Sequence, residues 1–522
     1  MKSVMSSQHS FAQVPQADIQ RSKFDRSHGL KTTFDADKLV PILVDEVLPG
    51  DTHTLNTNIF GRLATPINPI MDNLFLETFY FFVPMRLIWE DTERFFGERD
   101  NPTDSIDYTI PQSTLGSVPE GSIADHMGLP VGVSNLSVSV LPFRAYYLIY
   151  DEWFRDQNLQ NSPDVQKGSS GVRGNNTDYP VMLDLLTRGK RHDYFTSCLP
   201  WAQKGDSVNI GFGSQAPVST DGPQGSQVQV AFPTSTLPND YRQLVTSGSV
   251  ATLGTTTQAE GNVLYADLSA AEAVSINTWR QAFQIQKFLE RDARSGTRYI
   301  EKIKGHFGVT SPDARLQRPE YLGGDSQMIN VHPVPQTSST DATTPQGNLS
   351  AFGTVAGQQG GFSKSFTEHG YIIGLANVRA DLTYQQGLNK LWSRETQYDF
   401  YWPVFAHLGE QAVLNKEIYA QGSPIDDQVF GYQERYAEYR YKPSLITGKF
   451  RSDASASLDA WHLSQDFDSL PTLGDTFIKS NTPLDRVIAV QDEPHIIMDC
   501  YFNYTSVRPM PVYAPPGFVD HF

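Results

Sequence analysis

Hydrophobic and polar residues alternate with a period of two in several segments of the chain. Between residues 53 and 63 every second residue can face a core, and residues 496–505 repeat the pattern. Such alternation predicts a β-strand with one buried face. Residues 73–84 are apolar on both faces except at Glu77 and Thr78, which predicts a central strand covered on both sides. Strong strands near both ends of the chain predict an all-β sandwich closed by pairings distant in sequence.

Two segments follow the helical period instead. Residues 145–158 place several aromatic side chains on one flank. Residues 270–294 carry a broad apolar stripe, and they begin at a capping-box signature formed by Ser269 and Glu272. Gly296 directly after the last turn is typical of a helix end. We therefore expect two helices inserted between the strands.

Two long segments are almost purely polar. In residues 205–263, 36 of 59 positions are Gly, Ser, Thr, Gln, Asn or Pro, and residues 323–362 are similar and contain no Lys or Arg. Inserts of this length in a compact protein are usually functional or disordered. We predict that both are outward-facing polar loops. The charged residues assigned to the exposed surface of the first loop are Asp206, Asp221, Asp240 and Arg242.

The N-terminal segment differs in charge from the rest of the chain. Residues 1–36 are polar and partly basic and lack periodicity, so they predict an extended arm that precedes one folded body, residues 37–522. The arm either faces phosphate groups or is simply solvated. Its candidate DNA-facing residues are Arg21, Lys23, Arg26 and Lys31.

Composition narrows the class of protein. The 522 residues contain 41 Lys and Arg against 58 Asp and Glu, a net charge of −17, and 11% are aromatic. This is too aromatic for a disordered chain, and the charged fraction is too low for a long coiled coil. Cys198 and Cys500 are too few for a disulfide framework, so both are expected to be buried thiols in a reducing compartment. The sequence shows no secretory signal and no apolar run of membrane-spanning length, so no membrane insertion is expected.

Motifs for catalysis, cofactor binding or metal binding do not stand out. His407 and Glu410 lack a third ligand, and Gly168–Gly171 has no preceding strand to form a nucleophile elbow. We therefore expect no enzyme, cofactor or metal. One stretch, Tyr432–Lys442, mixes tyrosines with three basic residues in a way that suits single-stranded nucleic acid, where rings stack on bases. The alternative is a structural segment in which Glu434 and Glu438 neutralise the arginines. The candidate residues are Arg435, Arg440 and Lys442.

Long blocks of the chain resemble the major capsid proteins of gokushoviruses, a branch of the microviruses. The resemblance begins at RSKFDRSHGLKTTFDADKLVPILVDEVLPGD (Arg21–Asp51) and continues to Glu98. It resumes at LPFRAYYLIYDEWFRDQNLQ (Leu141–Gln160), at Arg280–Gly324 and at FGYQERYAEYRYKPSLITGKFR (Phe430–Arg451). These blocks span most of the chain and are idiosyncratic in sequence. The two polar loops fit the family least well.

The resemblance implies a fold and an assembly. Its members have an eight-stranded viral jelly roll with large loop and helical insertions, and sixty copies form a T=1 icosahedral virion around a circular single-stranded DNA genome. Residues 205–263 match, by position and polarity, an insertion that rises as a protrusion at the threefold axes and contributes to host attachment. The resemblance also implies partners: a small basic DNA-binding virion protein, internal scaffolding and pilot proteins, and a receptor on the host cell surface. Assembly is expected in the cytoplasm of the bacterial host.

Two other readings remain open on the residues alone. A carbohydrate-active β-sandwich enzyme would share the acidic charge and surface aromatics, and would need two carboxylates about 5–10 Å apart. A soluble receptor-binding protein would use loops such as 205–263 for recognition. Sedimentation separates the shell, which forms megadalton particles, from the enzyme, which forms a monomer or small oligomer.

Overall fold

A computed structural model describes most of the chain. The described residues are 20–105, 107–163, 165–169, 183–206, 208, 218–220, 228–231, 241–247, 250–258, 264–266, 276–310, 313, 315–340 and 345–513. The chain divides into two compact units. The first unit comprises Met1–Ala202 and Ser311–Phe522, and the second unit is Gln203–Thr310. Each unit is described by itself.

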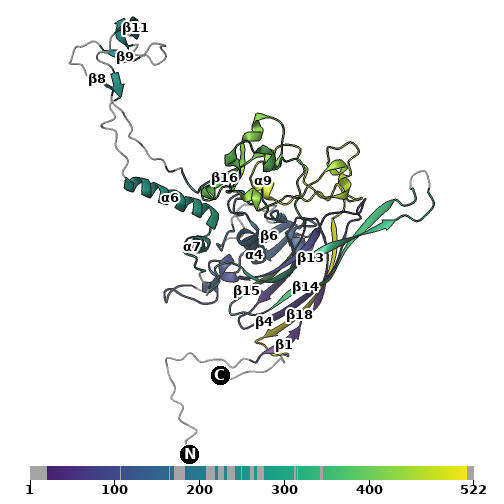
Figure 1. Ribbon diagram of the computed structural model, residues 1–522. Coiled ribbons are helices and arrows are strands. Elements are labelled where there is room, and N and C mark those ends of the chain that lie inside the picture. The colour runs from purple at the N-terminus through teal and green to yellow at the C-terminus, as the bar shows by residue number, and fades with distance from the viewer. Residues whose placement is uncertain are drawn as a thin grey trace, which may run out of the picture. The chain divides into compact units, whose positions relative to one another are not determined.

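One curled antiparallel sheet dominates the first unit (Figure 1). Its strand order is β1-β18-β4-β14-β13-β5-β15-β3, and β2 also pairs with β18. The strands are β1 (Ser22–Asp25), β2 (His28–Phe34), β3 (Val40–Val47), β4 (Thr52–Leu63), β5 (Leu74–Pro84), β13 (Glu320–Pro335), β14 (Leu349–Ser365), β15 (Gly370–Ala380) and β18 (Ile496–Arg508).

The N-terminal strands β1 and β2 lie one after the other along β18. β1 pairs with Thr505–Arg508 and β2 with Ile496–Phe502, so together they occupy one strand position. The nine strands are therefore eight strands across, which agrees with the predicted eight-stranded jelly roll. The predicted boundary at residue 36 is wrong, because residues 22–34 belong to the sheet of the main body. Backbone hydrogen bonds to β18, a partner more than 450 residues away, hold this segment, and its sequence carries no sign of them.

The predicted strand patterns are confirmed in β4, β5 and β18. Alternate residues of β4 and β18 are buried, and almost all of β5 is buried on both faces. The inward faces of the strands meet in one core that includes Leu55, Tyr80 and Phe502. Both predicted free thiols are buried, and burial raises the pKa of Cys500 to about 12. This core is that of an all-β sandwich, as expected.

The predicted polar loop 323–362 is wrong, since most of it forms the long strands β13 and β14. The N-terminal half of β13 pairs with β5 and its C-terminal half with β14, so β13 joins the two halves of the curled sheet. Glycines permit this corner: a Cβ atom on Gly323 would lie 2.5 Å from the carbonyl oxygen of Gly361. The Gly- and Gln-rich sequence that suggested a loop is therefore a consequence of tight backbone packing.

A helix covers the outer face of the β5–β15 part of the sheet. It runs as α4 (Leu141–Ile149) and continues as a π-helical turn, η1 (Tyr150–Phe154). The predicted helix 145–158 thus begins four residues earlier than expected and ends at Phe154. Tyr146 and Ile149 pack in a second buried cluster with Phe81 and Val83, the outward-facing residues of β5.

The second unit, Gln203–Thr310, contains short strands and two helices. Its strands are β8 (Val218–Thr220), β9 (Gln229–Ala231), β10 (Tyr241–Ser247), β11 (Val250–Gln258) and β12 (Leu264–Ala266), so the predicted loop 205–263 is not a loop throughout. The predicted helix 270–294 is confirmed as α6 (Ile276–Ser295), followed by Gly296 with a positive φ of 98°. Its predicted capping box lies outside the described residues. Helix α7 (Tyr299–Phe307) packs on α6, where Lys302 lies 3.0 Å from Asp292.

Shorter elements complete the first unit. Two hairpins are formed by β6 (Gln112–Ser117) with β7 (Ser134–Ser139) and by β16 (Glu410–Leu414) with β17 (Val429–Glu434). The short helices are α1 (Met85–Ile88), α2 (Thr92–Phe95), α3 (Ile123–His126), α8 (Asn415–Ile418) and α9 (Asp475–Ile478). The 3₁₀ turns are η2 (Lys390–Ser393), η3 (Gln397–Asp399), η4 (Pro403–Phe405), η5 (Pro424–Asp427), η6 (Ala437–Tyr439), η7 (Gly448–Phe450) and η8 (Asp459–Trp461).

Candidate interaction surfaces and a basic pocket

The basic residues predicted for the N-terminal arm have different surroundings. Arg26 donates two hydrogen bonds to Asp45, at 2.5 and 2.7 Å, and is half-buried. Burial raises the pKa of Asp45, but its hydrogen bonds outweigh burial and hold that pKa below its usual range. Lys31 lies 3.4 Å from Asp499 on the surface, Arg21 donates to the Thr52 hydroxyl, and Lys23 is exposed on β1. Arg26 is therefore a structural residue of the sheet, whereas Lys23 and Lys31 stay accessible.

The second predicted basic cluster has one ion pair within its own segment. Arg440 forms an ion pair with Glu434, and the Arg435 guanidinium lies 4.9 Å from the ring centre of Tyr436. Lys442 is exposed. The structural alternative, in which Glu434 and Glu438 neutralise the arginines, holds for Glu434 only, because Glu438 lies 3.5 Å from Arg394, outside the segment. Whether these residues face DNA remains a prediction.

The residues predicted for the polar insert are only partly described. Asp206 is exposed and its carbonyl oxygen accepts a hydrogen bond from Gln203 at 2.6 Å. Arg242 lies in β10, opposite Val230 of β9. Asp221 and Asp240 fall outside the described residues.

A large group of exposed apolar side chains gathers in the segment between residues 391 and 408. Trp392 is 73% exposed and Val404 84% exposed, although both are of a kind that normally packs inside. Groups of exposed apolar side chains of this kind mark interaction sites in soluble proteins. We call this group the aromatic patch. Its members are Leu391, Trp392, Tyr398, Phe400, Tyr401, Trp402, Val404, Leu408 and the neighbouring Tyr439.

Contacts within the chain fix the conformation of the aromatic patch in the unbound subunit. The Trp402 indole donates to the carbonyl of Gln397 at 2.8 Å, and the Tyr439 hydroxyl accepts from the Tyr401 amide at 3.3 Å. The Arg394 guanidinium lies 4.3 Å from the ring centre of Tyr439. A preorganised surface loses less conformational entropy on binding. The patch is therefore suited to docking against another protein.

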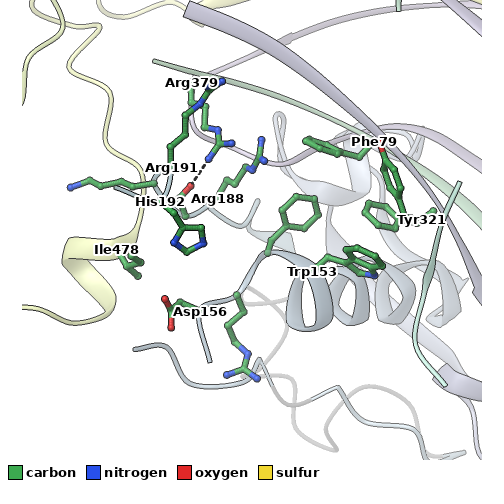
Figure 2. Close-up of a pocket in the computed structure, with 14 residues that line it drawn as sticks. Phe79, Trp153, Asp156, Arg188, Arg191, His192, Tyr321, Arg379 and Ile478 are labelled. Atoms are coloured by element: carbon green, nitrogen blue, oxygen red, sulfur yellow. Dashed lines mark hydrogen bonds between the residues drawn. The ribbon is translucent and has the colours of Figure 1, made fainter. Parts of the chain in front are cut away.

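A pocket with a volume of about 460 Å³ opens on the face of the sheet that points away from the main core (Figure 2). One side is aromatic: Phe79 and Phe81 come from β5, Trp153 and Phe154 from η1, and Tyr321 from β13. Figure 2 shows Arg188, Arg191 and Arg379 close together in the pocket. Lys190 also lines the pocket, and the Arg188 guanidinium lies over the aromatic side, 4.7 Å from the ring centre of Phe79 and 5.4 Å from that of Phe154. Because these residues come from segments far apart in the chain, only the folded protein brings them together.

Positive charge dominates the basic side of the pocket. Glu77 accepts hydrogen bonds from Arg188, from Arg379 at 3.0 Å and from Arg191 at 3.4 Å. Burial raises the pKa of Glu77, but the guanidiniums outweigh burial and keep it below its usual range. Burial lowers the pKa of Arg188 to about 10 and that of Lys190 to about 8. Three guanidiniums thus share the buried carboxylate of Glu77, and one of them, Arg191, also pairs with Asp381 at 3.0 Å.

Sequence reasoning missed this pocket. The local signal was the basic run Arg188-Gly-Lys190-Arg191-His192. The run alone did not reveal the aromatic side, which is contributed by strands and a helical turn more than 30 residues away. No sequence pattern linked the two.

Replacing Lys190 by methionine is expected to stabilise the protein by about 3 kcal/mol at neutral pH. An ordinary lysine pKa of 10.5 and a folded value of about 8 differ by that amount, because the folded state holds a poorly solvated charge. The unfolded chain binds more protons between pH 8 and 10.5, so the penalty is full below pH 8 and disappears above 10.5. Urea unfolding of both proteins at pH 7 and pH 10.5 measures this. An equal difference at both values would contradict the explanation.

No group of three or more His, Cys, Asp or Glu side chains within the described ranges is placed to hold a metal ion. Among the helices that the structure describes, none is both long and apolar enough to cross a membrane.

Comparison with known proteins identifies the family. Residues 12–518 match the family described as "Capsid protein (F protein)". Capsid protein VP1 of Bdellovibrio phage phiMH2K is 50% identical over 535 residues, which cover 99% of this chain and 98% of that protein. Capsid protein VP1 of Chlamydia phage 1 is 46% identical, with 97% of each covered, and that of Spiroplasma virus 4 is 38% identical, with 98% of this chain and 97% of that protein covered.

These matches bear on the readings that the sequence left open. They confirm the resemblance to gokushovirus capsid proteins, and the relatives' names favour a structural role over a carbohydrate-active enzyme. A capsid role places the protein in the virion. The chain therefore belongs to the phage capsid protein family that includes the F protein.

Proposed function

We propose that sixty copies of this protein assemble into a T=1 icosahedral shell around a circular single-stranded DNA genome. The aromatic patch is the observation that carries the proposal, since a surface so apolar and so firmly held is suited to burial against a second copy. Each subunit of a closed shell contacts several neighbours, so modest interfaces add up. Electron microscopy and sedimentation of the purified protein test this. Small isometric particles support it, whereas a monomer under all ionic conditions opposes it.

The net negative charge of the protein supports the proposal that other proteins take part in packaging the genome. A net charge of −17 cannot neutralise a genome, so cations must come from elsewhere, and a small basic DNA-binding virion protein meets this need. Internal scaffolding and pilot proteins belong to the same proposal, as does assembly in the cytoplasm of the bacterial host. The two buried free thiols suit that reducing compartment.

Host attachment is proposed for the second unit. Gln203–Thr310 is compact in its own right, which is what an insertion that carries a separate role requires. Its partner is a receptor on the host cell surface. Deleting residues 205–263 should then abolish attachment while leaving shell assembly intact.

Replacing Val404 by aspartate is expected to prevent shell assembly while leaving the subunit folded. The side chain is 84% exposed, so the change should alter subunit stability by less than about 0.5 kcal/mol. In a shell, every copy would bury an unpaired charge, which typically costs several kcal/mol. Light scattering should detect no particles of V404D even at roughly 10 times the protein concentration at which the wild type assembles.

The matched control is Val490→Asp, at another exposed valine of the same unit outside the aromatic patch. It is expected to assemble as the wild type does. Normal particles from V404D would show that the patch does not lie between subunits.

A further inference from the structure

We propose that the basic pocket of Figure 2 holds one nucleotide of the enclosed single-stranded DNA, with the base on its aromatic side and the phosphate on its cationic side. The inference rests on the proposed function, because it needs a single-stranded genome inside the shell. A flexible single strand alternates planar bases with phosphates, and proteins bind it by combining ring stacking with positive charge. The pocket presents both kinds of group to one space.

The aromatic side offers ring surface in a fixed arrangement. The ring of Phe81 lies 5.5 Å from those of both Trp153 and Tyr321, measured between centroids. The Trp153 indole donates to the carbonyl of Pro319 at 2.9 Å, which sets its orientation. Tyr321 is 44% exposed, so part of its ring is available to a ligand. The Arg318 guanidinium lies 4.8 Å from the centre of the Trp153 ring, which makes Tyr321 the better platform for a base.

The cationic side has hydrogen-bond donors without acceptors. Within the described part of the chain, the Lys190 ammonium forms no direct ion pair, although the charges of Asp193 and Asp37 act to raise its pKa, and it lies 4.4 Å from the ring centre of Phe477. The Nε atom of Arg191 is buried and has no hydrogen-bond partner. Buried donors of this kind are costly unless a ligand satisfies them. A phosphate group supplies both the negative charge and several acceptor oxygens.

Size agrees with one nucleotide unit. Pockets that bind small molecules usually measure roughly 300–1,000 Å³, and the volume of about 460 Å³ lies in the lower part of that range. A double helix does not fit such a recess, and its bases are already stacked on one another. The chemistry therefore points to a single strand with one unpaired base turned into the pocket.

The test measures binding of a fluorescently labelled short oligothymidylate to the full-length protein by anisotropy. Tyr321→Leu keeps an apolar side chain of similar size but removes the ring, and Tyr321→Phe keeps the ring. Stacking is worth about 1–3 kcal/mol per base, so Y321L should bind roughly 5- to 150-fold more weakly and Y321F should bind like the wild type. Equal binding by Y321L and Y321F would overturn the proposal.

The phosphate half of the proposal has its own readout. Lys190→Met removes one cation without leaving a buried carboxylate unpaired, and the slope of log affinity against log salt concentration should become shallower by about 0.7. Lys449→Met, at an exposed lysine that does not line the pocket, should leave that slope unchanged. The same slope for K190M and the wild type would refute the phosphate contact.

A crosslinking experiment separates the two proposals and tests for a different occupant. An oligonucleotide containing 5-iodouracil should crosslink to Tyr321 or Trp153 on irradiation. Displacement of the oligonucleotide by an acidic peptide, without any crosslink in the pocket, would assign the pocket to a protein segment and reject the nucleotide. If Y321L formed normal particles and bound the oligonucleotide as tightly as the wild type, the proposal for the pocket alone would be refuted. If the wild type formed no particles, the proposal of a shell would be refuted.

Discussion

Replacing Glu77 by glutamine is expected to destabilise the protein by about 3–5 kcal/mol, the usual cost of removing one partner from a buried ionic cluster. Glu77 is 8% exposed and accepts hydrogen bonds from Arg188, Arg191 and Arg379. Glutamine keeps the shape of the side chain and removes its charge, so the guanidiniums lose the carboxylate that compensates them. Urea unfolding of the isolated subunit, followed by tryptophan fluorescence, measures the loss.

The matched control for Glu77 is Glu434→Gln. Glu434 also pairs with an arginine, Arg440, but both side chains are more than half exposed. Exposed pairs contribute about 0–1 kcal/mol, so this variant should unfold almost as the wild type does. If E77Q and E434Q lost equal stability, burial of the cluster would not explain the effect.

The ionic cluster around Glu77 should also make the stability of the protein depend on pH in the acid range. The folded pKa of Glu77 lies below its ordinary value of 4.5. Its contribution to stability is therefore complete above pH 4.5 and is lost as the pH falls through the folded pKa, because the unfolded chain takes up the proton first. In E77Q that part of the acid sensitivity should be missing, so the stability gap between the two proteins should narrow at low pH.

Replacing Gly361 by alanine is expected to cost at least about 4 kcal/mol and to prevent accumulation of folded subunits. A Cβ atom at this position would collide with the carbonyl oxygen of Leu55, a backbone atom of β4 that cannot move without breaking the sheet. The residue lies at a register shift between β14 and β4, next to the corner where β13 crosses between the two halves of the sheet. Thermal unfolding and the soluble yield measure the effect.

Gly116→Ala is the control for this substitution. A Cβ atom on Gly116 meets nothing within 4 Å, and its φ is not in the left-handed region. Alanine there should be neutral or stabilising by up to about 1 kcal/mol, because it reduces the entropy of the unfolded chain. A folded G361A subunit with the melting temperature of G116A would show that the corner tolerates a side chain.

The sequence predicted those strands whose pattern is local and whose two faces differ. In β4 and β18 mostly apolar buried residues alternate with mostly polar exposed ones, so the alternation in the sequence was enough to predict the strands. The strands β13 and β14 were not predicted, because their glycines are required by close contacts across the sheet and not by residues next to them in the chain. Gly324, for example, lies directly beside the backbone of Thr78. Their polar composition then resembled that of a loop.

The candidate site shows the same division. A local run of basic residues suggested DNA contacts at Arg26, but its carboxylate partner Asp45 stands 19 residues later in the chain and could not be foreseen from the run. The aromatic segment around Trp402 could be noticed because its residues are consecutive. The pocket could not, since Phe79, Arg188, Tyr321 and Arg379 meet only through the topology of the sheet.

The position of β18 has a consequence for synthesis on the ribosome. This strand lies between β4 and the N-terminal strands, so among the described strands β2 has no partner until residues 496–502 have been translated, and β1 has none until residues 505–508 have been. A nascent chain therefore carries an open strand edge and an unfinished core through most of its elongation. Closure between strands so far apart in the sequence is slow and prone to aggregation. Chaperones that shield exposed strand edges should therefore limit the yield of assembly-competent subunits.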